Sequence, residues 1–171
     1  MSSRSRWARK VRVAPAVLRL LWRLRRLPPR LGPEDLVRAV TPRRPDWTGC
    51  PDLALAAAWL ARALVRRLPR LFPQPCLYGS LAGYHFLTRG GSDARVHFGL
   101  RPAGEELEFH AWLSVEGRPC FDDAPAQGFQ EMLCLPRPAS GVLRQAQGDH
   151  RGGFAQPPGA GVPQAPAGRA Q

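Results

Sequence analysis

Apolar residues recur at helical spacing in three stretches of the first half of the chain. Over residues 17–27, leucine and valine line one side while arginine recurs on another, which predicts an amphipathic helix. Over residues 51–68, a broader apolar stripe predicts a core helix that ends before Pro69. Residues 76–88 also show a helical pattern, and the glycine pair at 90–91 is a typical C-terminal stop. The stripe of the second helix consists of Leu53, Leu55, Ala56, Trp59, Leu60, Ala63, Leu64 and Leu68.

The pattern changes to alternation further along, which predicts an antiparallel sheet. Residues 95–100 and 107–115 have the composition of strands joined by a turn, and a third strand is expected near residues 118–121. Helices first and an antiparallel sheet after them is an α+β organisation. The two faces of the second strand are Glu108, His110, Trp112 and Ser114 on one side, and Leu107, Phe109, Ala111, Leu113 and Val115 on the other.

Composition divides the chain into three regions. Residues 1–50 form a basic, amphipathic helical region that includes a short helix near residues 34–40. Residues 51–136 carry the periodic helices and strands, and a chain of 171 residues has room for one such domain with appendages. Residues 137–171 are rich in glycine, proline, alanine and glutamine and lack apolar periodicity. This tail is predicted to be disordered, because it cannot bury enough surface to offset its ordering entropy.

The formal charge of +12 is almost entirely arginine, since Lys10 is the only lysine. Arginine suits phosphate or carboxylate partners, but the same composition also follows from a GC-rich coding sequence. The arginines are dispersed, and no nucleic-acid-binding motif is present, so nucleic-acid binding is the less favoured class. The basic helix over residues 17–27 is open to three uses: packing on the domain, docking on a partner, or peripheral contact with an anionic membrane.

No secretory signal or membrane span is predicted, because arginines interrupt the apolar segment near the N-terminus and the longest apolar run covers residues 53–61. The cysteines show no CxxC pair and no zinc-site spacing, which predicts reduced thiols in the cytoplasm, with no metal and no cofactor. A set of His97, His110 and Cys120 has no supporting spacing either. The four cysteines are Cys50, Cys76, Cys120 and Cys134.

Three residues have the order and setting of a catalytic triad. Cys76 opens a predicted helix, where free amide groups and the helix dipole stabilise a thiolate. His110 lies in a strand that would fix the position of a general base. Asp122 follows on the next strand, where it would orient and stabilise the imidazole. Asp123 is the competitor, because a one-residue slip turns a side chain to the other face. Judged alone, Cys76 also suits a core position and His110 an exposed one.

The sequence segments around these residues resemble those of the transglutaminase-like leader peptidases of lasso peptide biosynthesis. This family is related to the C-terminal half of the microcin J25 processing protein. The resemblance covers roughly residues 51–136. It implies a transglutaminase-like, papain-like fold, in which helices pack on a small antiparallel sheet after an N-terminal helical segment. Ser114 departs from the glutamate expected there, and Gly79-Ser80 suggests a flexible helix start. The matching segments are Pro75-Cys76-Leu77, the helical run to Arg89-Gly90, Phe109-His110-Ala111-Trp112-Leu113, and Gly117-Arg118 before Asp122.

The resemblance implies a cytoplasmic Cys–His–Asp cysteine protease that removes the leader from a ribosomally made lasso precursor peptide. A separate asparagine-synthetase-like cyclase would then close the ring. Short members of the family rely on a separate leader-binding protein, and the helix over residues 17–27 is the expected docking element, through Leu21 and Leu24. The alternative is another acyl-transfer enzyme on the same fold, since the triad does not choose between water and an amine as acceptor.

Overall fold

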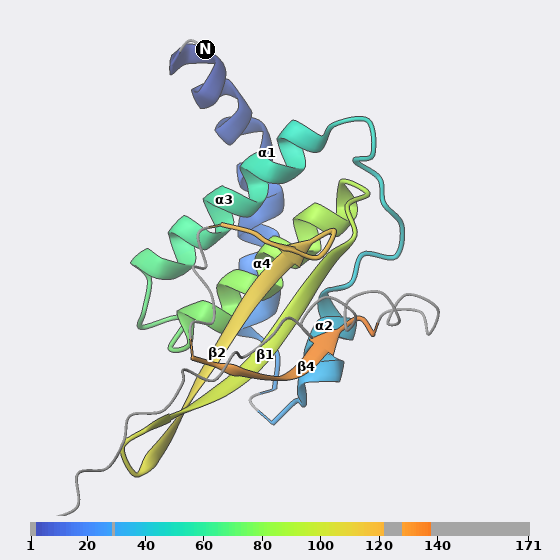
Figure 1. The fold of residues 1–171 in the computed structure, drawn as a ribbon. Coiled ribbons are helices and arrows are strands. Elements are labelled where there is room, and N and C mark those ends of the chain that lie inside the picture. Colours follow the sequence, from blue (N-terminus) through green and yellow to red (C-terminus); the bar gives the residue numbers. More distant parts are fainter. Residues whose placement is uncertain (1–2, 29, 122–127, 138–171) are drawn as a thin grey trace, which may run out of the picture. The chain divides into compact units, whose positions relative to one another are not determined.

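A computed structural model describes residues 3–28, 30–121 and 128–137 of the chain. Four helices precede a four-stranded antiparallel sheet, and the described residues up to Arg137 belong to one compact unit (Figure 1). The elements are α1 (Ser3–Arg25), α2 (Pro33–Val40), α3 (Pro51–Arg67), α4 (Pro75–Arg89), β1 (Ala94–Ala103), β2 (Glu106–Val115), β3 (Arg118–Pro119) and β4 (Gln130–Leu135).

Helix α4 is central to the packing. It contacts the other three helices on one side and strands β1 and β2 on the other. The strand order is β3-β2-β1-β4, with every neighbouring pair antiparallel. The tip of the long β1–β2 hairpin projects past the helices in Figure 1. The expected α+β fold, with helices packed on a small antiparallel sheet, is therefore confirmed.

The sheet differs from its prediction at both ends. A tight turn at Glu116 and Gly117 leads into β3, and both turn residues have positive φ values, of 51° and 75°. That pair of values suits a two-residue hairpin, because its twist matches that of the flanking strands. β3 then covers only two residues, and β4 was not predicted at all. The polar and apolar residues of β4 do not alternate strictly, so alternation alone does not reveal the strand.

Helix α3 is a core helix, as predicted, but the predicted apolar stripe is not its buried face. Leu55 and Trp59 are 42% and 49% exposed. The buried side is formed mainly by small residues, which let α3 approach α4 closely. At the C-terminal end of α4, a Cβ on Gly90 would lie 2.7 Å from the Cβ of Ala54. The leucine face would have held the helices further apart. The buried residues are Ala54, Ala57, Ala58, Ala61, Arg62 and Val65.

Helix α1 begins at Ser3, ahead of the predicted segment, and packs against α3. Leu21 and Leu24 lie in the hydrophobic core of the domain, so they are not available to enter a groove on a partner. Leu18, expected on the same side, is instead 59% exposed. None of the described helices is long and apolar enough to cross a membrane. The predicted tail lies outside the described residues, apart from Arg137.

Candidate active site

Cys76 lies in the first turn of α4, as the sequence predicts. Pro75 precedes it in the helix, and Gln74, at the N-cap position, makes no side-chain capping hydrogen bond. The first-turn amide groups of a helix have no partner within the helix, and the dipole adds positive potential there. Cys76 therefore lies where the helix presents free amide groups and positive potential.

His110 lies in β2, paired with Gly99 of β1. Its ring stacks on Trp112, with centroids 6.1 Å apart, and packs against Phe129 at 5.0 Å. Cys76 and His110 line the same cavity of about 190 Å³, although no hydrogen bond joins them in the described part of the chain. The fold thus brings two of the three predicted catalytic residues to one small cavity.

A buried hydrogen bond joins the two elements that carry Cys76 and His110. The Ser80 hydroxyl in α4 donates to the carbonyl oxygen of Ala111 in β2 over 3.0 Å. Three residues further along α4, a Cβ on Gly83 would overlap the side chain of Leu113. Glycine at this position is therefore what allows α4 to lie so close to β2. The Gly79-Ser80 pair, taken as flexible from the sequence, lies in a buried part of α4.

Asp122 and its competitor Asp123 lie outside the described residues. The described chain reaches Cys120, whose amide donates to the Leu113 carbonyl over 3.0 Å, and then Phe121, which has a φ of 70°. The segment that leads to the two aspartates thus runs beside β2. The choice between Asp122 and Asp123 stays a prediction.

Arg62 is a cavity residue that the sequence reasoning missed. It is only 6% exposed, and it lines the cavity together with Cys76 and His110. Its guanidinium lies 4.7 Å from the centre of the Phe121 ring. A fixed positive charge beside the cavity favours a thiolate or an oxyanion. The glycines of α4 were the available signal, because they leave room for the Arg62 side chain.

A second cysteine and histidine come together in the sheet. His97 of β1 lies 2.7 Å from Glu131 through Nδ1 and 2.6 Å from the Ser114 hydroxyl through Nε2. Cys134 Sγ lies 4.0 Å from the same Nε2. Burial raises the pKa of the Cys134 thiol, which keeps it protonated at neutral pH. Because only the thiolate is a good nucleophile, Cys76 is the better candidate for catalysis.

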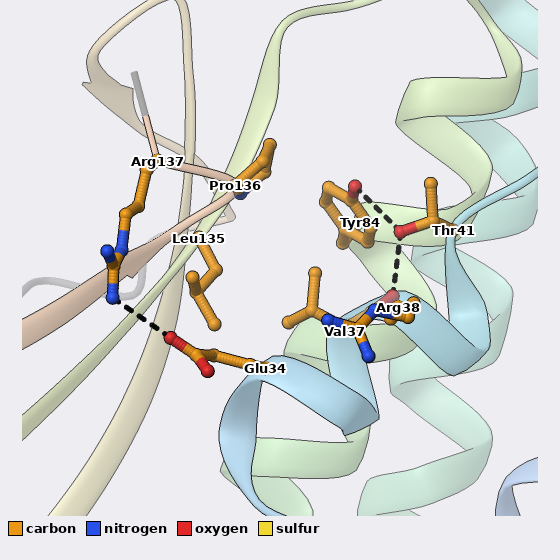
Figure 2. A pocket seen from close by; sticks show the side chains of 8 residues that line it. All are labelled: Glu34, Val37, Arg38, Thr41, Tyr84, Leu135, Pro136 and Arg137. Carbon is orange, nitrogen blue, oxygen red and sulfur yellow. Dashed lines mark hydrogen bonds and ion pairs between the residues drawn. The ribbon is translucent and has the colours of Figure 1, made fainter. Parts of the chain in front are cut away.

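A larger groove of about 620 Å³ lies between α2, α4 and the end of β4 (Figure 2). Tyr84 and Thr41 share a hydrogen bond of 3.1 Å on one side, and Arg137 pairs with Glu34 over 3.1 Å on another. No cysteine or histidine lines it. Although it is larger than the cavity at Cys76, its lining has neither the thiol nor the imidazole that the predicted mechanism needs.

A basic cleft of about 1010 Å³ lies where α1, α4 and the loop after α2 meet. The carboxylate in its lining, Asp46, forms a bidentate ion pair with Arg89, and the hydrogen bonds from Arg89 lower the pKa of Asp46. His85 lies at the cleft wall. It packs on Phe86, its Nδ1 lies 2.6 Å from the Val40 carbonyl, and burial lowers its pKa. The arginines of the cleft are Arg23, Arg38, Arg43, Arg44 and Arg89.

A cysteine at the start of a central helix, sharing a cavity with a histidine on an antiparallel sheet, is the arrangement of papain-like cysteine enzymes. The sequence model of the transglutaminase-like superfamily matches residues 14–134, and the chain belongs to that superfamily. Cys–His–Asp catalysis is typical of its members. The match reaches back into α1, in agreement with the packing of that helix in the core. Comparisons with curated proteins and with solved structures found no match.

Proposed function

We propose that this protein is a cytoplasmic cysteine peptidase that removes the leader from a ribosomally made lasso peptide precursor before macrocyclisation. The observation that carries the proposal is the shared cavity of Cys76 and His110 in a transglutaminase-like domain. The sequence segments around both residues resemble those of the lasso leader peptidases, and this resemblance supports the choice of substrate.

In the proposed mechanism, His110 takes the proton from Cys76, and the thiolate attacks the scissile carbonyl. The protonated His110 then gives its proton to the departing amine, and water releases the acyl group from Cys76. Asp122 orients the imidazole, and Arg62 stabilises the negative charge that develops in the cavity. The cavity, at about 190 Å³, is too small to hold a whole precursor peptide. The remainder of the precursor would therefore lie on the protein surface.

Delivery of the precursor is proposed to depend on a separate leader-binding protein. Since Leu21 and Leu24 are buried, the contact moves to the exposed side of α1. There, Leu18 and Trp22 are 59% and 57% exposed, and the Arg26 guanidinium stacks on Trp22 at 3.6 Å. An acidic partner surface with an apolar centre would complement this combination. The released amine would then pass to the asparagine-synthetase-like cyclase.

The test is cleavage of a synthetic precursor peptide by the full chain, with and without the leader-binding protein, followed by mass spectrometry. We expect one cut at the leader–core junction, faster with the partner because the scissile segment is concentrated at Cys76. Leu18→Ser with Trp22→Ser should remove the stimulation and keep the slow unassisted reaction. Arg12→Ser with Arg19→Ser is a control on the same helix. Equal loss of both reactions would mean that this side of α1 serves the domain's own structure and not the partner.

Acyl transfer to an amine is the second candidate function, because the same cavity and residues serve both reactions. Adding a primary amine to the cleavage assay separates them. A peptidase gives the free carboxylate of the leader as its main product, whereas a transferase gives the amide.

Binding of nucleic acid is a third candidate function, supported by the basic cleft. A salt-dependent mobility shift with DNA that is lost in an Arg43→Gln, Arg44→Gln variant would favour it.

A further inference from the structure

His97 of β1 and Glu131 and Cys134 of β4 form a cluster of potential metal ligands. One ligand atom from each residue lies within 4.8 Å of the other two. The three side chains come from neighbouring strands of one sheet, with His97 directly opposite Cys134 in the register. Imidazole, carboxylate and thiolate are the three side-chain groups that bind zinc in proteins.

A β-bulge brings two of these ligands to the same face of the sheet. Glu131 and Cys134 are three residues apart, so regular alternation would turn them to opposite faces. In β4, however, Leu133 pairs with Phe98 and Glu131 pairs with Gly99, so Met132 falls between the two pairs. The extra residue restores Glu131 to the face of Cys134. Bulges often re-aim a side chain at a functional position.

Each ring nitrogen of His97 has an oxygen within hydrogen-bonding distance. Glu131 faces Nδ1 at 2.7 Å, and the Ser114 hydroxyl faces Nε2 at 2.6 Å. Without metal, a proton lies between Nδ1 and the Glu131 carboxylate, since two acceptors 2.7 Å apart would repel. Zinc at Nδ1 would replace that proton, with Nε2–H donating to the Ser114 hydroxyl. A histidine that binds metal typically donates its other ring N–H to a nearby oxygen in this way. The ring itself is held by stacking on Trp112, with centroids 5.3 Å apart and planes at 8°.

We propose that His97, Glu131 and Cys134 bind one zinc ion, with water in the fourth position. Zinc bonds of about 2.0–2.3 Å set ligand atoms roughly 3.3–3.8 Å apart in a tetrahedral site. The three ligand atoms lie within 4.8 Å of one another, so zinc would draw them to that spacing. The Glu131 side chain, which is half exposed, has room to move. The thiolate ligand selects zinc over calcium or magnesium, which prefer oxygen. Binding releases the thiol proton of Cys134.

This site is distinct from the candidate active site and does not depend on the proposed peptidase activity. It would fasten the edge strand β4 to β1. Trp112 lies between the two sites, because it stacks on His97 and also on His110. Zinc at His97 would therefore fix the ring that packs against the proposed general base.

The test is zinc binding by the full chain, prepared metal-free and titrated with ZnCl2 against a chromophoric chelator. We expect one zinc per chain, and Co²⁺ in its place should give a thiolate charge-transfer band in the near ultraviolet. Cys134→Ser and Glu131→Gln should each abolish the stoichiometric binding, and Cys134→Ser should abolish the Co²⁺ band. Ser114→Ala should weaken zinc binding by about 10-fold or more.

Cys76→Ala and Cys50→Ser are the matched controls, and both should bind zinc as the unchanged chain does. Loss of zinc in Cys76→Ala with retention in Cys134→Ser would overturn the proposal, since the ion would then lie at the Cys76 cavity. Failure of the unchanged chain to bind one equivalent would overturn it as well. Circular dichroism of each variant separates loss of a ligand from loss of folding, and Glu131→Gln keeps the test valid if Cys134→Ser fails to fold.

Discussion

Cys76 and Cys134 are the same residue type in one domain, yet their surroundings favour different chemistry. Cys76 lies at the start of a helix, beside a buried arginine and in a cavity that also contains a histidine. Cys134 lies in an edge strand, near His97 and a carboxylate, and burial raises its pKa. Positive potential favours a reactive thiolate, whereas burial in the sheet keeps a thiol neutral until a cation replaces its proton. Local environment, more than the presence of a nearby histidine, separates a nucleophile from a ligand.

Substitution of each cysteine in turn tests this comparison most directly. Cys76→Ala should abolish leader removal, because no other described thiol is placed to attack from that cavity, and His110→Ala should be nearly as severe. Cys134→Ala should retain most activity. Initial rates from mass spectrometry, with circular dichroism to confirm folding, provide the measurement. Full activity of a folded Cys76→Ala variant would eliminate the proposed mechanism.

Asp122→Asn should lower kcat on the order of 10² to 10⁴-fold while leaving the fold intact, because the amide cannot stabilise the imidazolium. Asp123→Asn is the matched control and should have a milder effect. Steady-state kinetics on both variants decide between the two aspartates. A more severe effect at Asp123 would show that the strand register assumed for the triad is wrong by one residue.

Arg62→Met should lower kcat/KM by about 10- to 100-fold, because it removes a fixed positive charge from the Cys76 cavity. Arg67→Met, also in α3, is the control and should leave kcat/KM unchanged. If the loss of activity is fully explained by a lower melting temperature, Arg62 contributes to packing alone.

Alkylation rates should show the smallest of the expected differences. The raised pKa of Cys134 leaves less thiolate at neutral pH, so iodoacetamide should modify Cys134 more slowly than the exposed Cys50. The gap should narrow as the pH rises, since the Cys134 thiol then loses its proton. Peptide mapping after timed quenching measures both sites in one sample. Faster modification of Cys134 near pH 7 would contradict the neutral thiol.

Local patterns predicted much of the framework. Helical periodicity located α3 and α4, alternation located β1 and β2, and the order of Cys76 and His110 suggested that the two would meet. These features are encoded by residues close together in the chain. The predicted buried face of α3 was wrong for the same reason. Hydrophobicity ranked Leu55 and Trp59 above alanine, whereas the close approach of α3 to α4 favours small side chains.

By itself, the sequence determined the α+β class, the helix start at Cys76 and the strand that carries His110. Only the tertiary structure decided which residues surround them. The buried position of Arg62 depends on the spacing between two helices, and the meeting of His97, Glu131 and Cys134 depends on a bulge in β4. Spacing along the chain cannot reveal either contact. Each is set by how distant segments pack, because side chains from separate elements become neighbours only when the core forms.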